Sequence, residues 1–206
     1  HYIVLFIQKW KKSIMKKVTI TFVLGLLFFL SIFSFMSKKK VVVIDAGHGG
    51  HDLGATYEGT NEKDIVLNIA KKIKEFNTDE NVEIILTRTE DAAPSLAERV
   101  ELINNLNPAM VISLHVNSSP KAEASSGKEI YSQETSKELG GKLASKFEDC
   151  KKVETKNLHL LRNCNSPTLL LELGYMNNES ERKNLQSESG QIEISKKILE
   201  FIEENQ

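Results

Sequence analysis

Three short apolar runs constrain the fold more than any other feature of this sequence. They are VVVI at 41–44, MVISL at 110–114 and TLLL at 168–171. Apolar runs of about four to eight residues, bounded by polar residues, are typical of strands that are covered on both faces. VEIIL at 82–86 predicts a fourth strand, and KEIYS, which begins at Lys128, predicts a smaller one at an edge. A sheet of several buried strands is therefore expected.

Segments with helical periodicity lie between these strands. Residues 62–76 place Ile65, Ile69, Ile73 and Phe76 on one face of a helix. The segment that begins at Pro94, residues 134–147 and the C-terminal segment around Ile194 also predict helices. Strands that alternate with helices indicate an α/β domain with a mostly parallel sheet and helices on both faces.

The first 40 residues differ from the rest of the chain. Residues 18–36 have no charged side chain and are long enough for a membrane-spanning helix of roughly 20 residues. Because MKK at 15–17 precedes this run, residues 1–14 are interpreted as an upstream extension and 15–40 as a signal sequence or a transmembrane anchor. Both interpretations place the remaining domain, 41–206, in the cell envelope outside the cytoplasm.

The charge of the chain is unevenly distributed. Eight of the 27 Lys and Arg residues lie in the first 40 positions, which have no acidic residue, so 19 basic and 28 acidic residues remain, a formal charge of −9. An acidic domain argues against a nucleic-acid partner. The two cysteines, Cys150 and Cys164, form no metal motif, and the sequence leaves open whether they pair or stay as thiols.

Polar residues with chemical function follow three of the apolar runs directly. Asp45 and then His48 follow the first run, His115 follows the second, and Glu172 follows the third. In open α/β sheets the ligand crevice lies beyond the carboxyl ends of the strands. These side chains are therefore expected to meet at one edge of the sheet.

A zinc site is one interpretation of that convergence. Catalytic zinc takes three protein ligands and leaves a position for water, and two histidines with a glutamate are one such set. His48 and His115 are candidates by position, and Glu62 at the start of the first helix is a candidate for the third ligand. The glycines of GHGGHDLGA, which begins at Gly47, permit the close backbone approach that a metal loop needs.

Simpler interpretations compete with the zinc site. A glycine-rich turn after a strand is more often a plain connection, and a histidine there is ordinarily a hydrogen-bonded structural residue. A phosphate-binding loop is not indicated, because its Lys-Ser/Thr ending is absent. His51 and Asp52 are expected to be solvent-facing loop residues, and His159 has no predicted role.

Glu172 poses a separate problem, since an ionised carboxylate next to a buried strand needs a partner. Three solutions are open at this stage. A cation lies close by, the carboxyl group stays protonated, or the strand ends and Glu172 opens into a cleft.

Five motifs in order resemble the zinc-dependent N-acetylmuramoyl-L-alanine amidases of the amidase-3 family, and they span nearly all of 41–206. They are DAGHGGHDLGA, NEKDIVLNIA, TRTED with LAERVELIN, SLHVNSS and LLLELGYMNN. The resemblance implies a six-stranded twisted sheet, a zinc ion held by His48, Glu62 and His115, and Glu172 as the catalytic carboxylate. It also implies the substrate, the amide between N-acetylmuramic acid and L-alanine in peptidoglycan.

Supporting roles are predicted for three further residues. Asp45 is expected to orient a ligating histidine and Asn117 to hold substrate. Arg99, in LAER, matches a position of the family, and a structural ion pair is its favoured role.

Two other functions fit the same fold, namely a non-catalytic wall-binding module and a zinc peptidase of the peptidoglycan stem. The intact set of His48, Glu62, His115 and Glu172 argues against the binding module, and the order of the motifs favours the amidase. No separate wall-binding domain is visible in the sequence. Localisation is therefore expected to come from the N-terminal segment and from a recruiting or regulatory protein.

Overall fold

The computed structural model describes residues 2–34, 39–119 and 125–205. The chain forms two compact units, His1–Lys38 and Lys39–Gln206, and the first of them consists of helix α1 (Tyr2–Ser34). Within the described ranges no helix combines the length and the hydropathy that a membrane span requires. The predicted anchor over 18–36 is not confirmed, and its last two residues lie outside the described ranges.

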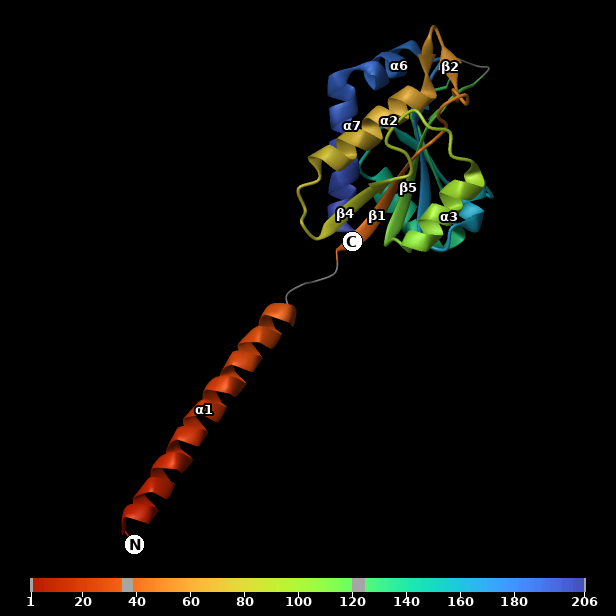
Figure 1. Cartoon of the computed structure of the whole chain (residues 1–206). Coiled ribbons are helices and arrows are strands. Elements are labelled where there is room, and N and C mark those ends of the chain that lie inside the picture. Colours follow the sequence, from red (N-terminus) through yellow and green to blue (C-terminus); the bar gives the residue numbers. More distant parts are fainter. Residues whose placement is uncertain (1, 35–38, 120–124, 206) are drawn as a thin grey trace. The chain divides into compact units, whose positions relative to one another are not determined.

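The second unit is built around one six-stranded sheet, in the order β4-β1-β5-β8-β6-β7. The strands are β1 (Lys40–Ala46), β4 (Val82–Leu86), β5 (Met110–Asn117), β6 (Lys128–Ser132), β7 (Cys150–Thr155) and β8 (Thr168–Tyr175). The first four in spatial order are parallel, β6 is antiparallel to β8, and β7 is parallel to β6. The predicted mostly parallel sheet of about six strands is confirmed (Figure 1).

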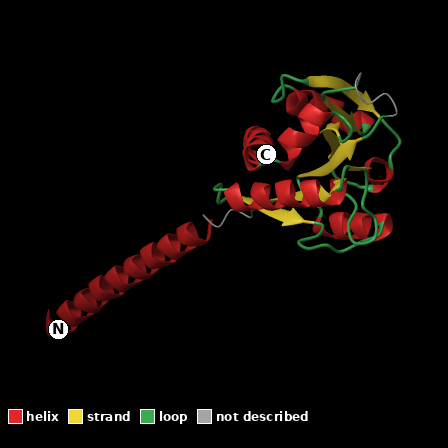
Figure 2. Cartoon of the chain, turned by 90° about the horizontal axis from the view of Figure 1, so that it is seen from above, coloured by secondary structure: helices red, strands yellow, loops and turns green. Residues whose placement is uncertain are grey.

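Helices cover both faces of this sheet, as predicted (Figure 2). Helices α2 (Glu62–Phe76), α4 (Lys137–Ala144) and α7 (Glu188–Glu204) pack on one face, and α3 (Leu96–Leu106) and α5 (His159–Asn163) pack on the other. Helix α6 (Glu179–Gln186) precedes α7, and a 3-10 turn (Glu134–Ser136) precedes α4. A hairpin of β2 (Thr56–Tyr57) and β3 (Thr60–Asn61) leads directly into α2.

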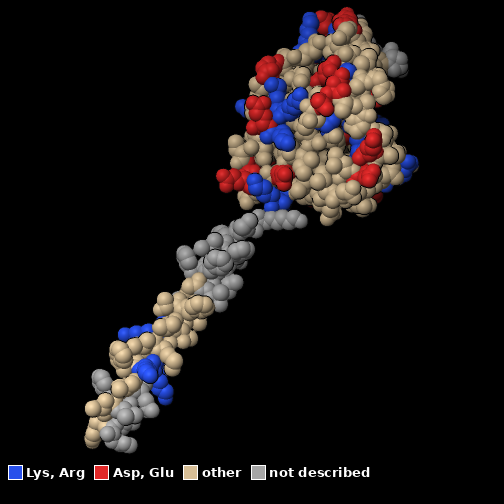
Figure 3. Space-filling view, viewed as in Figure 1, with Lys and Arg blue, Asp and Glu red and all other residues tan. Residues whose placement is uncertain are grey.

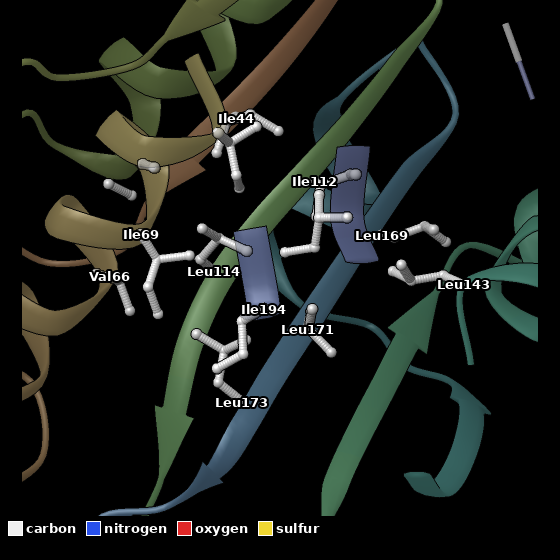
Figure 4. Packing of buried hydrophobic residues seen from close by; sticks show 14 of the residues in the cluster. Ile44, Val66, Ile69, Ile112, Leu114, Leu143, Leu169, Leu171, Leu173 and Ile194 are labelled. Carbon is white, nitrogen blue, oxygen red and sulfur yellow. The ribbon is translucent and has the colours of Figure 1, made fainter. Parts of the chain in front are cut away.

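Alternating strand residues supply the two layers of the core. Ile112 and Leu114 of β5 are fully buried in the larger layer, under α2 and α7 (Figure 4). Val111, which lies between Met110 and Ile112 in the strand, points to the other face and packs with Ile103 of α3. Both faces of the strands are covered, which explains why their sequences are continuous apolar runs and not alternating ones.

The ends of α3 follow from local chemistry. Ser95 is its N-cap and forms a capping box with Glu98, so the helix begins at Leu96, two residues after the predicted start at Pro94. Several elements were not predicted, namely the short β2–β3 hairpin, strand β7 and helices α5 and α6. β7 has the polar sequence CKKVET at the sheet edge, where apolar periodicity is weak. Cys150 and Cys164 are both free thiols.

The strands extend further than their apolar runs. Asp45, His115 and Glu172 were expected just beyond the strands, but they lie inside β1, β5 and β8. The reason is that backbone pairing continues past the apolar residues, with Asp45 opposite Ser113 and His115 opposite Glu172. The interpretation that the third strand ends at Glu172 is therefore wrong.

Charged side chains of both signs are interspersed on the face of this unit shown in Figure 3. Ion pairs also join elements of this unit, such as Lys72 of α2 with Glu188 of α7 at 2.5 Å. Exposed pairs of this kind contribute about 1 kcal/mol or less, so the fold depends on its two apolar layers.

Substitution of Ile112 tests that dependence. Ile112→Ala is expected to lower the free energy of unfolding by about 2–5 kcal/mol, because it leaves a cavity at a fully buried position between β1 and β8. Ile112→Val removes one methylene and should cost only about 0.5–1.5 kcal/mol. Denaturant unfolding measures both. Equal, small effects of the two variants would show that this layer is not tightly packed.

Candidate metal centre

Glu62, the first residue of α2, joins three parts of the fold through one buried carboxylate. Its Oε1 accepts a hydrogen bond from the backbone N–H of Val116 at 2.9 Å, and its Oε2 accepts one from Ala55 at 2.7 Å. The same Oε1 lies 2.9 Å from Nδ1 of His115 and 3.1 Å from Nε2 of His48. The carboxylate is thus fixed by backbone and faces both histidines.

The two histidines reach Glu62 from different elements. His115 lies in β5, whereas His48 lies in the glycine-rich loop after β1 and has a left-handed backbone with φ of 57°. Nδ1 of His48 lies 2.8 Å from Asp52, which leaves Nε2 to face Glu62. One ligand atom from each of His48, Glu62 and His115 lies within 4.8 Å of the other two.

Two glycines of this loop are required by close packing against these side chains. A Cβ at Gly47 would lie 2.4 Å from the ring of His115. A Cβ at Gly54, whose φ is +66°, would lie 2.5 Å from Oε2 of Glu62. Any side chain at either position would displace a member of the cluster.

The electrostatics of the cluster favour positive charge at its centre. The hydrogen bond to Glu62 raises the pKa of His48 to about 9, although burial opposes this shift. Burial raises the pKa of Glu62, but its contacts with His115 and His48 outweigh burial and lower that pKa to about 2. A group of three side chains that stabilises a proton so strongly is also suited to a metal cation.

Glu172 lies beside the cluster, opposite His115 in the register of β8 and β5. Its Oε2 is buried and has no hydrogen-bond partner among the described residues. Burial raises the pKa of this carboxyl group to about 7, a shift that His115 opposes and the nearby Glu62 and Glu129 reinforce. Burial thus makes Glu172 a stronger proton acceptor than an exposed glutamate.

A cavity of about 490 Å³ opens beside the two histidines. His51 and His159 line it together with apolar side chains from the starts of α3 and α5, including Leu96 and Leu158. This volume is in the range of small-molecule and peptide-fragment sites. The structure thus places His159, which had no predicted role, on the wall of the cavity.

Two buried arginines hold the backbone of the loop that contains His48. Arg88 donates to the carbonyl oxygens of Ala46 and Gly47, both at 2.9 Å. Arg99 donates to the carbonyl oxygen of Ala46 at 2.7 Å and to that of His48 at 2.6 Å. The loop is therefore fixed through its carbonyl groups, independently of its own side chains.

Known proteins resemble this chain over nearly its whole second unit. The family model of N-acetylmuramoyl-L-alanine amidase matches residues 42–204. The germination-specific N-acetylmuramoyl-L-alanine amidase of Bacillus subtilis is 25% identical, over 89% of this chain and 92% of that protein. The chain belongs to this amidase family.

Solved structures agree with that assignment. The catalytic domain of the amidase CwlV from Bacillus (Paenibacillus) polymyxa var. colistinus is 33% identical, with a TM-score of 0.76, over 80% of this chain and 97% of that domain. The CwlD amidase of Clostridioides difficile, solved in complex with the GerS lipoprotein, is 29% identical, with a TM-score of 0.76, over 81% of this chain and 98% of CwlD. The predicted family and the predicted enzyme class are confirmed.

In this amidase the structure shows the contacts of the three residues with predicted supporting roles. Asp45 accepts hydrogen bonds from Thr87, Ser113 and Arg99, and among the described residues no histidine is its partner. Arg99 forms the favoured structural ion pair, with Asp45 at 2.6 Å. Asn117 donates to Glu129 at 3.3 Å at the end of β5.

Two residues that support the cluster were not predicted. Asp52 was expected to be an ordinary loop residue, but it holds the ring of His48, as carboxylates commonly do for ligating histidines. The signal available for this contact was the spacing of four residues between His48 and Asp52. Outside a helix, such a spacing does not predict that two side chains meet. No feature of the sequence indicated that Arg88 supports the loop, because its partners are backbone carbonyls from distant parts of the chain.

The Asp45–Arg99 pair provides a stability test. Burial raises the pKa of Asp45, but Arg99 and the hydroxyls of Ser113 and Thr87 outweigh burial and hold the pKa below its ordinary value. Asp45→Asn should lower the free energy of unfolding by about 3–5 kcal/mol, because it leaves the buried charge of Arg99 uncompensated.

Asp149→Asn is the matched control, since its pair with Lys128 is partly exposed and should contribute about 1 kcal/mol or less. Chemical denaturation compares the two variants. Equal costs would contradict a structural role that is specific to the buried pair.

Proposed function

We propose that this chain hydrolyses the amide bond between N-acetylmuramic acid and L-alanine in peptidoglycan with the help of one zinc ion. His48, Glu62 and His115 are the proposed ligands, and Glu172 is the proposed catalytic carboxylate. One observation supports this most directly. Three ligand atoms converge next to a buried carboxylate oxygen that has no hydrogen-bond partner among the described residues.

The donor set supports zinc. Tetrahedral zinc with bonds of about 2.1 Å to nitrogen and oxygen keeps its ligand atoms roughly 3.4 Å apart. The separations of 2.9 and 3.1 Å between Glu62 and the two imidazoles are close to this value. Two imidazoles and one carboxylate are a known catalytic set, and the contact of His48 with Asp52 is the outer-shell partner that such sites have.

The proposed mechanism assigns proton transfer to Glu172. Bound zinc would supply Lewis acidity, polarising the scissile carbonyl and lowering the pKa of water. Glu172, with its pKa near 7, accepts the proton of the attacking water and then donates it to the leaving nitrogen. Glu62 and Asp52 keep the two imidazoles in their orientation, and Arg88 and Arg99 keep the loop of His48 in place.

The proposal extends to the place of action. Residues 41–206 would be the catalytic domain and 15–40 the signal sequence or anchor, with 1–14 as an upstream extension. Two relatives support action on peptidoglycan outside the cytoplasm by their names, which are a germination-specific amidase and a probable cell wall amidase. The solved complex of CwlD with a lipoprotein supports a recruiting or regulatory protein as a further partner.

Substitution of Gly54 tests the geometry of the proposed ligands. Gly54→Ala should weaken zinc binding by roughly 10- to 100-fold, because the new methyl group displaces Glu62. Gly59→Ala is the matched control, since φ at Gly59 is also positive, +77°, but no atom lies within 4 Å of the added Cβ. Competition with a chelator measures both affinities. Equal losses would show that backbone strain, and not contact with Glu62, causes the effect.

Digestion of purified peptidoglycan tests the reaction itself. The wild-type chain with zinc should release stem peptides that begin with L-alanine, as identified by mass spectrometry. Glu172→Gln should bind zinc normally and lose roughly 100- to 10,000-fold in rate, because the amide cannot accept the proton. Glu83→Gln makes the same change on the exposed edge strand and should leave the rate unchanged. Shortened stem peptides would instead indicate a peptidase, and undigested material a binding module.

A further inference from the structure

A second carboxylate faces Glu172 from the neighbouring strand. Glu129 of β6 is its direct partner in the antiparallel pairing of β6 and β8. Directly opposite residues lie on the same face of a sheet, with Cβ atoms about 4.5–5.5 Å apart. Because two like charges in this position repel each other, a pair of glutamates here is unfavourable for folding alone.

The surroundings of Glu129 differ from those of Glu172. Oε1 of Glu129 accepts a hydrogen bond from the hydroxyl of Tyr175 at 2.8 Å. Oε2 accepts one from Asn117 at 3.3 Å and another from the hydroxyl of Tyr131. A carboxylate has about four acceptor positions, so these three donors leave one position on Oε1. Glu129 is also partly exposed, which leaves it accessible to a substrate.

These contacts assign different charge states to the two glutamates. Burial raises the pKa of Glu129, but the hydroxyls of Tyr131 and Tyr175, together with the charges of Lys152 and Lys156, outweigh burial and hold the pKa below its ordinary value. Among the described residues no lysine or arginine pairs directly with Glu129, and the nearby Lys156 lies over the ring of Tyr131, 3.5 Å from its centroid. Glu129 is therefore a carboxylate whose oxygens are held by three donors, with one acceptor position free, directly opposite Glu172 in the sheet.

The reaction creates a positive charge at this place. Hydrolysis joins the oxygen of water to the carbonyl carbon and breaks the carbon–nitrogen bond. One proton of water passes through Glu172 to the leaving nitrogen, which gives a neutral amine, and the other passes from the new carboxylic acid to that amine. Near neutral pH the products are a carboxylate and an alkylammonium ion, so the leaving nitrogen gains positive charge next to Glu172.

We propose that Glu129 is a second catalytic carboxylate, which binds the amino group of the leaving L-alanine and stabilises its positive charge. Tyr131, Tyr175 and Asn117 position it by holding its two oxygens. This inference rests on the proposed function, because it requires Glu172 to protonate the leaving nitrogen. Pairs of carboxyl groups whose surroundings separate their charge states commonly divide catalytic roles in this way.

The test compares two leaving groups. One substrate is a soluble muramoyl peptide, and the other is its ester analogue, in which oxygen replaces the scissile amide nitrogen. An alcohol leaves without positive charge, so Glu129 should matter only for the amide. Glu129→Gln should lower kcat/KM for the amide by roughly 10- to 100-fold, the range for loss of a hydrogen bond to a charged group, and for the ester by less than about threefold.

Two further variants make the result specific. Glu129→Asp keeps the charge and should restore part of the amide activity. Glu154→Gln removes one negative charge from β7, at the position that pairs with Tyr131 in the sheet. This variant should leave both rates unchanged. Circular dichroism establishes that each variant is folded, and zinc analysis establishes that each variant has bound zinc. An equal loss on amide and ester by Glu129→Gln would overturn the inference, whereas a wild-type chain that cleaves neither substrate would overturn the proposed function instead.

Discussion

The contact of Glu62 with two imidazoles is the interaction on which the rest of the site depends. The carboxylate is fixed by backbone N–H groups of Ala55 and Val116, so it ties the loop after β1 and the end of β5 to the start of α2. A buried carboxylate with imidazole nitrogens at 2.9 and 3.1 Å favours positive charge on or beside the two rings. The packing of the fold therefore brings together three side chains that could hold a cation.

Much of the surrounding structure holds the loop of His48 in a conformation that it would not adopt alone. His48 has a positive φ, which is uncommon for a residue with a side chain. Arg88 and Arg99 bind three successive carbonyl groups of this loop, and Lys63 binds a fourth, that of Gly50, at 2.9 Å. Strain of this kind is typical of functional sites and persists only where many contacts maintain it.

Sequence periodicity predicted the elements that the core requires and missed those that depend on other interactions. The bounds of α2 were predicted correctly, because its apolar residues repeat with helical spacing under the sheet. β7 was missed because an edge strand needs no apolar face. The closeness of His48, Glu62, His115 and Glu172 was expected from their positions at the ends of apolar runs or at a helix start and from a family resemblance, whereas the contacts of Asp52, Arg88 and Glu129 were not. Their roles depend on contacts that only the folded chain creates, such as the opposition of Glu129 and Glu172.

The central claim is that His48, Glu62 and His115 hold one zinc ion beside Glu172. X-ray diffraction from crystals of the zinc-loaded chain, with data on both sides of the zinc absorption edge, tests it most directly. We expect one anomalous peak per chain, within about 2.0–2.2 Å of one nitrogen of each histidine and of one oxygen of Glu62. A peak at other residues, or no peak in a crystal of zinc-loaded and active protein, would contradict the account.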